Sequence, residues 1–289
     1  MGSPKISAFY CPLSCNGKHK GEMMSVLADL NNAGLDYSYT ELTGQSYEEI
    51  RSKSEGCDII IIGGGDGTVN RVINATYLLG AEYILLPSGS GNDFTRSWTG
   101  SKYEGNIIEM IRNGRPDYSD LWILNDNQVF VQSIFLGVSI RTIEIKNATG
   151  CRGYTKPIIK ALKGYKGDKF KIVSDDGNAE GRYLMTALQN VRTTCNGMRV
   201  TDMSDTSDGK MEVALCDYRN LGRLILNFMA IKIGWLCHQP NTQVIRTDHV
   251  EIIGEGTLTY TVDGEIKKSD KLEVKLSEHR IKIRHLPKE

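Results

Sequence analysis

The chain has 289 residues, of which 40% are hydrophobic, which is enough for one large domain or two of ordinary size. Its 35 Lys and Arg balance 35 Asp and Glu, so a globally basic nucleic-acid binder is not expected. No apolar run approaches the roughly 20 residues that span a bilayer, so we expect no transmembrane segment. Seven scattered cysteines without a CxxC pair, and five histidines without HExxH spacing, favour reduced thiols, no zinc site and a cytoplasmic protein.

Strands and helices are predicted to alternate through residues 1–118. The predicted strands are Lys5–Tyr10, Tyr37–Leu42, Asp58–Ile62 and Tyr83–Leu86. Segments with helical periodicity or helix-start signals lie around them, at Glu22–Ala33, Ser46–Glu49, Val69–Leu79 and Gly105–Asn113. Asp58–Ile62 is continuously apolar, as are strands buried on both faces of a parallel sheet. This order predicts an α/β domain whose parallel sheet is covered by helices.

The pattern changes after Pro116. Short segments with β character follow in succession, and many alternate apolar and polar residues as half-buried antiparallel strands do. They are Leu121–Leu124, Gln128–Ser133, Lys169–Ser174, Arg182–Ala187, Met211–Cys216, His249–Ile253, Leu258–Val262, Leu272–Leu276 and Arg280–Arg284. Helical stretches at Thr155–Tyr165 and Leu221–Leu236 interrupt them, and Asp175–Asn178 is typical of a hairpin turn. We predict an all-β, antiparallel sandwich domain at 119–289, whose extreme C-terminus could return to the first domain.

A glycine loop with a single acid follows the strand Asp58–Ile62. Its residues are Gly63, Gly64, Gly65, Asp66, Gly67 and Thr68. Ligands bind at the carboxyl ends of parallel strands, where glycines let the main chain approach a phosphate and the next helix offers free N–H groups. Asp66 would repel a phosphate unless a cation or a reacting hydroxyl lay between them, which suggests Mg²⁺ or an acceptor hydroxyl. A tight strand–helix turn with a capping Asp is the alternative.

A second glycine loop follows the next predicted strand, Tyr83–Leu86. Gly89 and Gly91 flank Ser90, and Asn92 and Asp93 come directly after them. Two glycine loops on successive strands, each ending in Asp, favour a two-walled nucleotide site over two unrelated turns.

The segments GGGDGTVNRVINA and LPSGSGNDFTRS together resemble the diacylglycerol kinase catalytic-domain family, which includes bacterial soluble lipid kinases and the sphingosine and ceramide kinases. The resemblance covers nearly the whole chain. It implies a first domain of the NAD-kinase and phosphofructokinase type, with ATP and Mg²⁺ as cofactors and nucleotide contacts from both loops. The family's second loop is usually P-x-G-T-x-N-D, and Ser90 keeps the hydroxyl of the replaced Thr.

Two earlier stretches fit the same resemblance. YCPLSCNGK, residues 10–18, is similar to the family's N-P-x-S-G-x-G-K loop, with Ser14 retained and with Cys11 and Cys15 in place of Asn and Gly. Thr40 matches a family threonine that contacts nucleotide, although an ordinary strand threonine is an equal alternative.

TVDGEIKKS, residues 261–269, matches the family's D-G-E turn, which carries its proposed general base. The resemblance makes Glu265 the leading catalytic candidate, with Asp263 beside it and Asp66 in the first glycine loop. A carboxylate near the acceptor hydroxyl can take its proton as the bond to the γ-phosphate forms. A plain β-turn is the alternative, since Asp-Gly is a common hairpin signal.

DMSDTSDGKMEV, residues 202–213, resembles a family segment that holds a structural Mg²⁺ in bacterial members. The resemblance implies Asp208 as a ligand, with Asp205 and the backbone carbonyl of Lys210 at the flanking positions. Hard oxygen ligands suit Mg²⁺. Ser207 stands where the family has its first acid, and an acidic surface hairpin is the alternative.

These observations lead to an ATP-dependent lipid kinase that acts on a lipid hydroxyl, with a diacylglycerol-like acceptor favoured and ATP between the two domains. The lipid would come from a membrane surface, so the protein is expected to be cytoplasmic and peripherally membrane-associated, and a homodimer remains open. The apolar helix Leu221–Leu236 favours core over a lipid groove, and the basic run Ile159–Lys171 favours a solvated face over headgroup contact. A soluble-substrate kinase of the NAD-kinase type and a catalytically inactive nucleotide-binding regulator are the alternatives.

Overall fold

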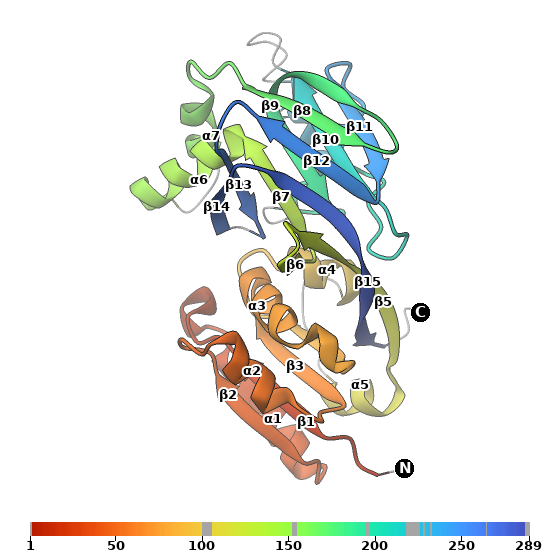
Figure 1. Ribbon diagram of the computed structural model, residues 1–289. Coiled ribbons are helices and arrows are strands. Elements are labelled where there is room, and N and C mark those ends of the chain that lie inside the picture. The colour runs from red at the N-terminus through yellow and green to blue at the C-terminus, as the bar shows by residue number, and fades with distance from the viewer. Residues whose placement is uncertain are drawn as a thin grey trace. The chain divides into compact units, whose positions relative to one another are not determined.

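A computed structural model describes residues 2–99, 106–151, 155–194, 197–217, 226–227, 229–231, 233–263 and 265–286. The chain divides into two compact units, Met1–Leu121 with Ser277–Glu289, and Trp122–Leu276 (Figure 1). The first is an α/β unit and the second is a mainly antiparallel β unit with a sandwich-like core. Strands β5 (Arg115–Leu124) and β15 (Leu272–His285) each run from one unit into the other.

A parallel sheet forms the centre of the first unit. Its strands lie in the order β2-β1-β3-β4-β15, with β1 (Ile6–Tyr10), β2 (Tyr37–Glu41), β3 (Ile59–Gly64) and β4 (Glu82–Pro87). All neighbouring pairs are parallel. Every residue of β3 is buried, which agrees with the continuous apolar run expected of a strand covered on both faces.

Helices cover both faces of this sheet. They are α1 (Lys20–Asn32), α2 (Tyr47–Ser54), α3 (Asp66–Thr76), α4 (Asp93–Thr99) and α5 (Ile107–Asn113), with short 3-10 turns at Ser14–Gly17 and Tyr77–Leu79. Apolar residues of α1 and α5 share one core cluster with alternate residues of β1, β3 and β4. On the intervening residues, Ser7 Oγ donates to the Lys53 carbonyl of α2 at 2.6 Å, and Thr76 of α3 hydrogen-bonds Tyr83 of β4 at 2.9 Å. Apolar packing therefore joins α1 and α5 to the sheet, and side-chain hydrogen bonds join α2 and α3 to it.

The second unit is built around the long strand β9 (Ala179–Gln189). One edge of β9 pairs first with β8 (Asp168–Ser174) and then with β7 (Ser133–Gly137), while its other edge pairs with β10 (Met211–Asp217). The remaining strands are β6 (Gln128–Phe130), β11 (Thr242–Thr247), β12 (His249–Gly254), β13 (Leu258–Val262) and β14 (Glu265–Ser269). Large side chains of these strands, Trp122 and Phe130 among them, form one buried cluster. Helices α6 (Val138–Thr149) and α7 (Thr155–Leu162) pack beside β7 and β9.

Several predicted elements are confirmed and others are wrong. The Ser46–Glu49 capping box is present, with both reciprocal hydrogen bonds, and Asp175–Asn178 connects the antiparallel pair β8 and β9. The predicted strands Leu272–Leu276 and Arg280–Arg284 form one continuous strand, because β15 pairs with β12 at its start and with β4 near its end. In the predicted helix Leu221–Leu236, residues 226–227, 229–231 and 233 are helical, and Leu221, Leu224, Ile225 and Phe228 lie outside the described residues.

Candidate active site

The carboxyl ends of β1 to β4 meet at one edge of the parallel sheet. Tyr10 pairs with both Glu41 and Gly63, and Gly64 pairs with Pro87. Backbone contacts continue past the strand ends, since the Cys11 N–H donates to the Gly63 carbonyl at 3.0 Å. The loops that follow these strands therefore lie side by side, as the sequence predicts for a ligand site in an open α/β sheet.

The two glycine loops pack main chain against main chain. Ser88 donates its N–H to the Gly64 carbonyl at 3.0 Å. A Cβ placed on Gly89 would lie 2.3 Å from the Cα of Gly65, and one placed on Gly65 would lie 3.0 Å from the Cα of Gly89. The close approach of the loops thus requires glycine at position 89 and leaves little room for a side chain at position 65, so packing accounts for these two loop glycines without any ligand.

Asp66 links the first glycine loop to the helix that follows the second. It is the first residue of α3, and its Oδ1 accepts the Phe94 N–H at the start of α4 at 3.2 Å. Asn92, in left-handed backbone with φ 53°, closes its own loop by hydrogen bonds of 2.8 Å to both the N–H and the carbonyl of Gly89. Asn92 and Asp93 are buried, so their roles include holding the loop.

The exposed residues of the two loops are Gly67 and Ser90. A Cβ on Gly67 would meet nothing within 4 Å, and its φ lies outside the left-handed region. Packing and backbone conformation therefore do not require glycine there. Gly67 lies in the first turn of α3, where N–H groups lack intrahelical partners and attract anions. Thr68, partly buried in the same turn, has its side chain packed under Gly64.

Residues at or just after the carboxyl ends of β1 and β2 lie at the same edge of the parallel sheet. Ser14, in the turn after β1, accepts the Gly65 N–H on its Oγ at 3.1 Å, so it braces the glycine loop. Thr40, near the end of β2, accepts a hydrogen bond from the Lys53 ammonium at 3.2 Å. Lys20 forms an ion pair of 3.1 Å with Glu41, and that hydrogen bond lowers the pKa of the partly exposed glutamate. Two lysines thus contact residues at the carboxyl end of β2.

The predicted Asp-Gly-Glu turn lies in the second unit, between β13 and β14. Asp263 has left-handed backbone with φ 45°, and its Oδ1 accepts the Ser133 N–H at 3.1 Å while its Oδ2 accepts the Val131 N–H at 3.5 Å. Its own N–H donates to the Ser133 carbonyl at 3.0 Å. The side chain of Glu265 is exposed. Main-chain hydrogen bonds therefore hold the Asp263 carboxylate, whereas the Glu265 side chain faces solvent.

The predicted structural-metal residues are already engaged within the chain. Asp205 Oδ1 accepts both the N–H and the hydroxyl of Ser207, at 3.0 and 2.8 Å. Asp208 Oδ1 accepts the Lys210 N–H at 2.9 Å, and its Oδ2 is ion-paired with Arg246. A guanidinium therefore lies where a cation would bind, so these residues do not fit a metal ion. Among the residues the structure describes, the group of three ligand atoms close enough to share an ion is Asp202, Cys237 and His238.

An apolar cavity of about 120 Å³ lies within the second unit. It is lined by α6, α7, β7, β9, the segment around Met198 and Val200, and the helical residues Asn227 and Ile231. Cys216 also borders it, and burial raises the pKa of that thiol to about 11, so the side chain stays neutral. The cavity suits a hydrocarbon group, and no short motif in the sequence pointed to it.

Exposed apolar side chains lie next to this cavity. Leu226, Met229 and Ile233 are spaced by three and four residues on one helical stripe, and Ile233 is 71% exposed. Asn227 and Ile231, on the other side of the same segment, line the cavity. Among the helices described, none has the length and apolar character needed to cross a bilayer.

Each of the two units matches a known protein family. Residues 5–122 match the diacylglycerol kinase catalytic domain, and residues 133–283 match the YegS C-terminal NAD kinase beta sandwich-like domain. The chain belongs to the diacylglycerol kinase catalytic-domain family. The predicted resemblance is confirmed, and the chain is a member of the lipid and diacylglycerol kinase family.

Relatives extend this match over the full chain. The chain is 24% identical over 292 residues to proteins named "Probable lipid kinase YegS-like" from Yersinia pestis (strain Pestoides F) and Yersinia pseudotuberculosis serotype O:1b (strain IP 31758). The match covers 95% of this chain and 96% of each relative. A solved structure from Bacillus anthracis str. Sterne shares the fold with a TM-score of 0.80 at 15% identity, covering 98% of this chain and 96% of that one. Another, named as a diacylglycerol kinase from the same strain, has a TM-score of 0.72 at 16% identity and covers 99% and 98%.

Proposed function

We propose that this protein is an ATP- and Mg²⁺-dependent lipid kinase that transfers the γ-phosphoryl group to a lipid hydroxyl, with a diacylglycerol-like acceptor favoured. The observation that carries the nucleotide part is Gly67. None of the residues that the structure describes occupies the space where its side chain would be, and its backbone does not need glycine. A glycine in the open first turn of a helix is explained if a phosphate approaches its main chain closely.

The proposed phosphate site uses residues from both glycine loops. Gly67 offers a first-turn N–H group and Thr68 a hydroxyl, and the exposed Ser90 offers a second hydroxyl. Lys20 and Lys53, held beside Glu41 and Thr40, add positive charge at the same edge. Phosphoryl transfer depends mainly on such positioning and charge neutralisation.

Asp66 is the proposed holder of the catalytic Mg²⁺. Its carboxylate belongs to the strand end beside the proposed phosphates, and its Oδ1 is oriented by the Phe94 N–H. A hard oxygen ligand at this place fits Mg²⁺, which when bound would offset the negative charge of the phosphates. Asp93 is buried one residue before Phe94, and we propose that it supports the same loop.

Glu265 is the proposed general base. It is exposed, so its carboxylate is accessible to an acceptor hydroxyl and can take the proton that the hydroxyl loses. Asp263 lies two residues earlier, and its carboxylate is bonded to the N–H groups of Val131 and Ser133. We assign Asp263 the task of fixing the turn that carries Glu265.

The acceptor is proposed to be a lipid because of the apolar cavity and the apolar stripe beside it. A hydrocarbon chain could lie against the cavity walls, while Leu226, Met229 and Ile233 contact the membrane from which the lipid comes. Clustered exposed apolar side chains often mark a membrane or binding surface. The protein would then associate peripherally with membranes.

The deciding experiment incubates the purified chain with labelled ATP and Mg²⁺, using vesicles that contain diacylglycerol, phosphatidylglycerol, a sphingoid base or a polyprenol, and NAD in a separate reaction. Thin-layer analysis should show a labelled lipid that disappears with Asp66→Asn. Label in the NAD reaction alone would identify a soluble-substrate kinase. Nucleotide binding without a labelled product from any acceptor would indicate a regulator that lacks catalysis.

Membrane association is tested separately by vesicle flotation. Replacing Leu226, Met229 and Ile233 together by serine should reduce the bound fraction and the activity on vesicles, while activity on detergent-dispersed acceptor is kept. The matched control replaces Leu13, an exposed leucine of the first unit, by serine. Unchanged flotation of the triple variant would remove this stripe from the membrane contact.

A further inference from the structure

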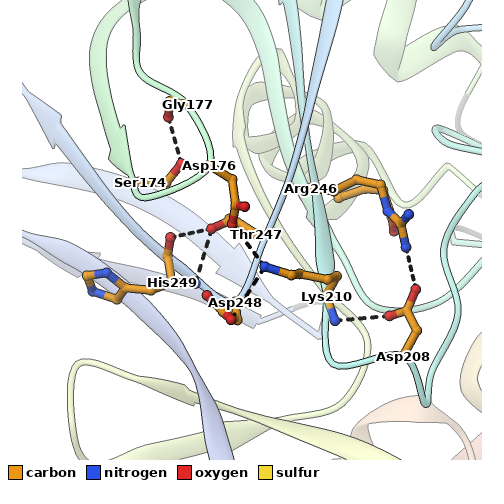
Figure 2. Close-up of polar contacts among 10 residues, drawn as sticks. Ser174, Asp176, Gly177, Asp208, Lys210, Arg246, Thr247, Asp248 and His249 are labelled. Carbon is orange, nitrogen blue, oxygen red and sulfur yellow. Dashed lines mark hydrogen bonds and ion pairs between the residues drawn. The ribbon is translucent and has the colours of Figure 1, made fainter.

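A network of two cations and four carboxylates joins the turns at one end of the second unit. Figure 2 labels Lys210, Arg246 and three of the carboxylates, those of Asp176, Asp208 and Asp248. It includes Asp208 and Lys210, two of the residues that the family resemblance places at a structural Mg²⁺. Asp208 is ion-paired through Oδ2 with the Arg246 guanidinium, and its Oδ1 accepts the Lys210 N–H at 2.9 Å. Both carboxylate oxygens of Asp208 therefore contact donors of the chain itself.

Arg246 is fixed by the sheet as well as by this loop. In the antiparallel pair of β10 and β11, Arg246 lies directly opposite Glu212. Its Nε donates to Glu212 Oε1 at 3.1 Å, and the Glu212 side chain is fully buried. A buried carboxylate needs a paired charge, so Glu212 holds the guanidinium in the position from which it also reaches Asp208.

Lys210 makes a second bridge, between two turns. Its ammonium lies 3.0 Å from an oxygen of Asp176, in the β8–β9 hairpin, and 3.4 Å from one of Asp248, in the β11–β12 turn. The Lys210 hydrogen bond lowers the pKa of Asp176, as a cationic partner should. The two side chains thus connect three loops, each of which ends a strand of the same unit.

We propose that Arg246 and Lys210 replace the structural divalent ion in this protein, so that the fold of its β unit is independent of Mg²⁺. A guanidinium joins two carboxylates through a planar set of donors, whereas a Mg²⁺ ion at Asp208 would have to displace it. The position of the metal in the family's loop is therefore occupied by a side chain from β11. This inference is independent of the proposed activity, because it concerns the stability of the protein without nucleotide or lipid.

The test measures the melting temperature and the bound metal of the full chain in the absence of nucleotide. After dialysis against EDTA the wild-type protein should retain no stoichiometric magnesium, and its melting temperature should be the same with EDTA and with added MgCl₂. Arg246→Met should lower the melting temperature by about 4 °C or more, since it leaves Glu212 buried without its partner. Arg246→Lys keeps the positive charge but cannot donate to Glu212 and Asp208 at the same time through a planar group, so it should lower the melting temperature less.

Two further variants show that the effect belongs to this network. Lys169→Met, which removes an exposed ion pair of 3.3 Å to Glu255 on the same unit, should leave the melting temperature nearly unchanged. Arg246→Met and Asp208→Asn combined should cost less than the sum of the two single changes, because the residues are direct partners. A wild-type melting temperature that falls in EDTA and returns with Mg²⁺ would overturn the proposal. So would an Arg246→Met protein as stable as Lys169→Met, and if Arg246→Met does not fold, Arg246→Lys gives the same comparison.

Discussion

The Phe94 N–H donates to Asp66 Oδ1 at 3.2 Å, across two loops that lie 28 residues apart in the sequence. Asp66 begins the helix after the first glycine loop, and Phe94 lies in the first turn of the helix after the second. One carboxylate therefore sets the spacing of both helix starts at the proposed phosphate site. The same carboxylate is the proposed ligand of the catalytic Mg²⁺.

Asp66→Asn should separate these two tasks. The Asn side-chain oxygen can still accept the Phe94 N–H, so the free energy of unfolding should change by no more than about 1 kcal/mol. The loss of the negative charge should lower kcat by at least about 100-fold, because a charged ligand for the proposed Mg²⁺ is removed. Denaturant unfolding and initial-rate kinetics provide the two measurements.

Asp66→Ala is the matched comparison, because it also removes the hydrogen-bond acceptor. It should destabilise the protein by about 1 kcal/mol more than Asp66→Asn. If Asp66→Asn keeps wild-type kcat, Asp66 has only the structural task, and the proposed Mg²⁺ ligand must be sought elsewhere.

Glycine-to-alanine changes in the two loops should act in opposite directions. At Gly89 the new Cβ would lie 2.3 Å from Gly65 Cα, so the backbones must move apart at a cost of about 1–3 kcal/mol. At Gly67 the Cβ meets open space in a helical turn, and alanine should stabilise the protein by about 0.5–1 kcal/mol. Calorimetric ATP titration should nevertheless show a Kd at least about 10-fold higher for Gly67→Ala, a loss of about 1.4 kcal/mol of binding free energy. The reason is that the added methyl group would lie where the proposed phosphate approaches the main chain. Unchanged ATP affinity in this more stable protein would contradict the proposed site.

Much of the first unit could be predicted because its signals are local. A continuous apolar run, a glycine loop after each of two strands and the Ser46–Glu49 box depend on residues close together in the sequence. The structure places them at one strand edge because parallel strands present their carboxyl ends on the same side. The predicted ranges of β3 and β4 are too short, since Gly63 and Gly64 join β3 through pairing with β1 and β4, and β4 extends to Glu82 and Pro87. Helix α4 is not among the predicted elements.

The second unit was harder to predict because its elements depend on distant partners. Helix α6 has the sequence VSIRTIEIKNAT, whose β-branched residues favour strands, and packing beside α7 and β9 decides in favour of the helix. The role of Arg246 depends on its register opposite Glu212 and on a loop 38 residues away, which no local pattern encodes. The apolar cavity likewise collects side chains from separate segments.

The Asp-Gly-Glu turn should show a division between stability and catalysis. Asp263→Ala removes a carboxylate bonded to two main-chain N–H groups and places alanine at φ 45°, so it should cost about 2–4 kcal/mol of unfolding free energy.

Glu265→Gln changes an exposed side chain and should alter stability by less than about 0.5 kcal/mol. Its kcat should fall by about 10²–10⁴-fold, because the amide cannot accept the acceptor's proton. Asp263→Asn, which tolerates the left-handed backbone, is the control for the turn, and normal turnover by Glu265→Gln would exclude Glu265 as the base.

Filling the apolar cavity should change the choice of acceptor without changing the use of nucleotide. Ser139 of α6 lines the cavity and is partly exposed, so Ser139→Phe can place an aromatic ring in it. The KM for dioleoylglycerol should rise several-fold more than the KM for dioctanoylglycerol, while the KM for ATP stays constant, because only the hydrocarbon space is reduced. Ser139→Ala keeps the space open and should behave as wild type, and melting temperatures of both variants check that the fold is retained. Equal effects on the two acceptors would mean that the acyl chains do not enter this cavity, and the lipid part of the proposed function would then depend on the apolar stripe alone.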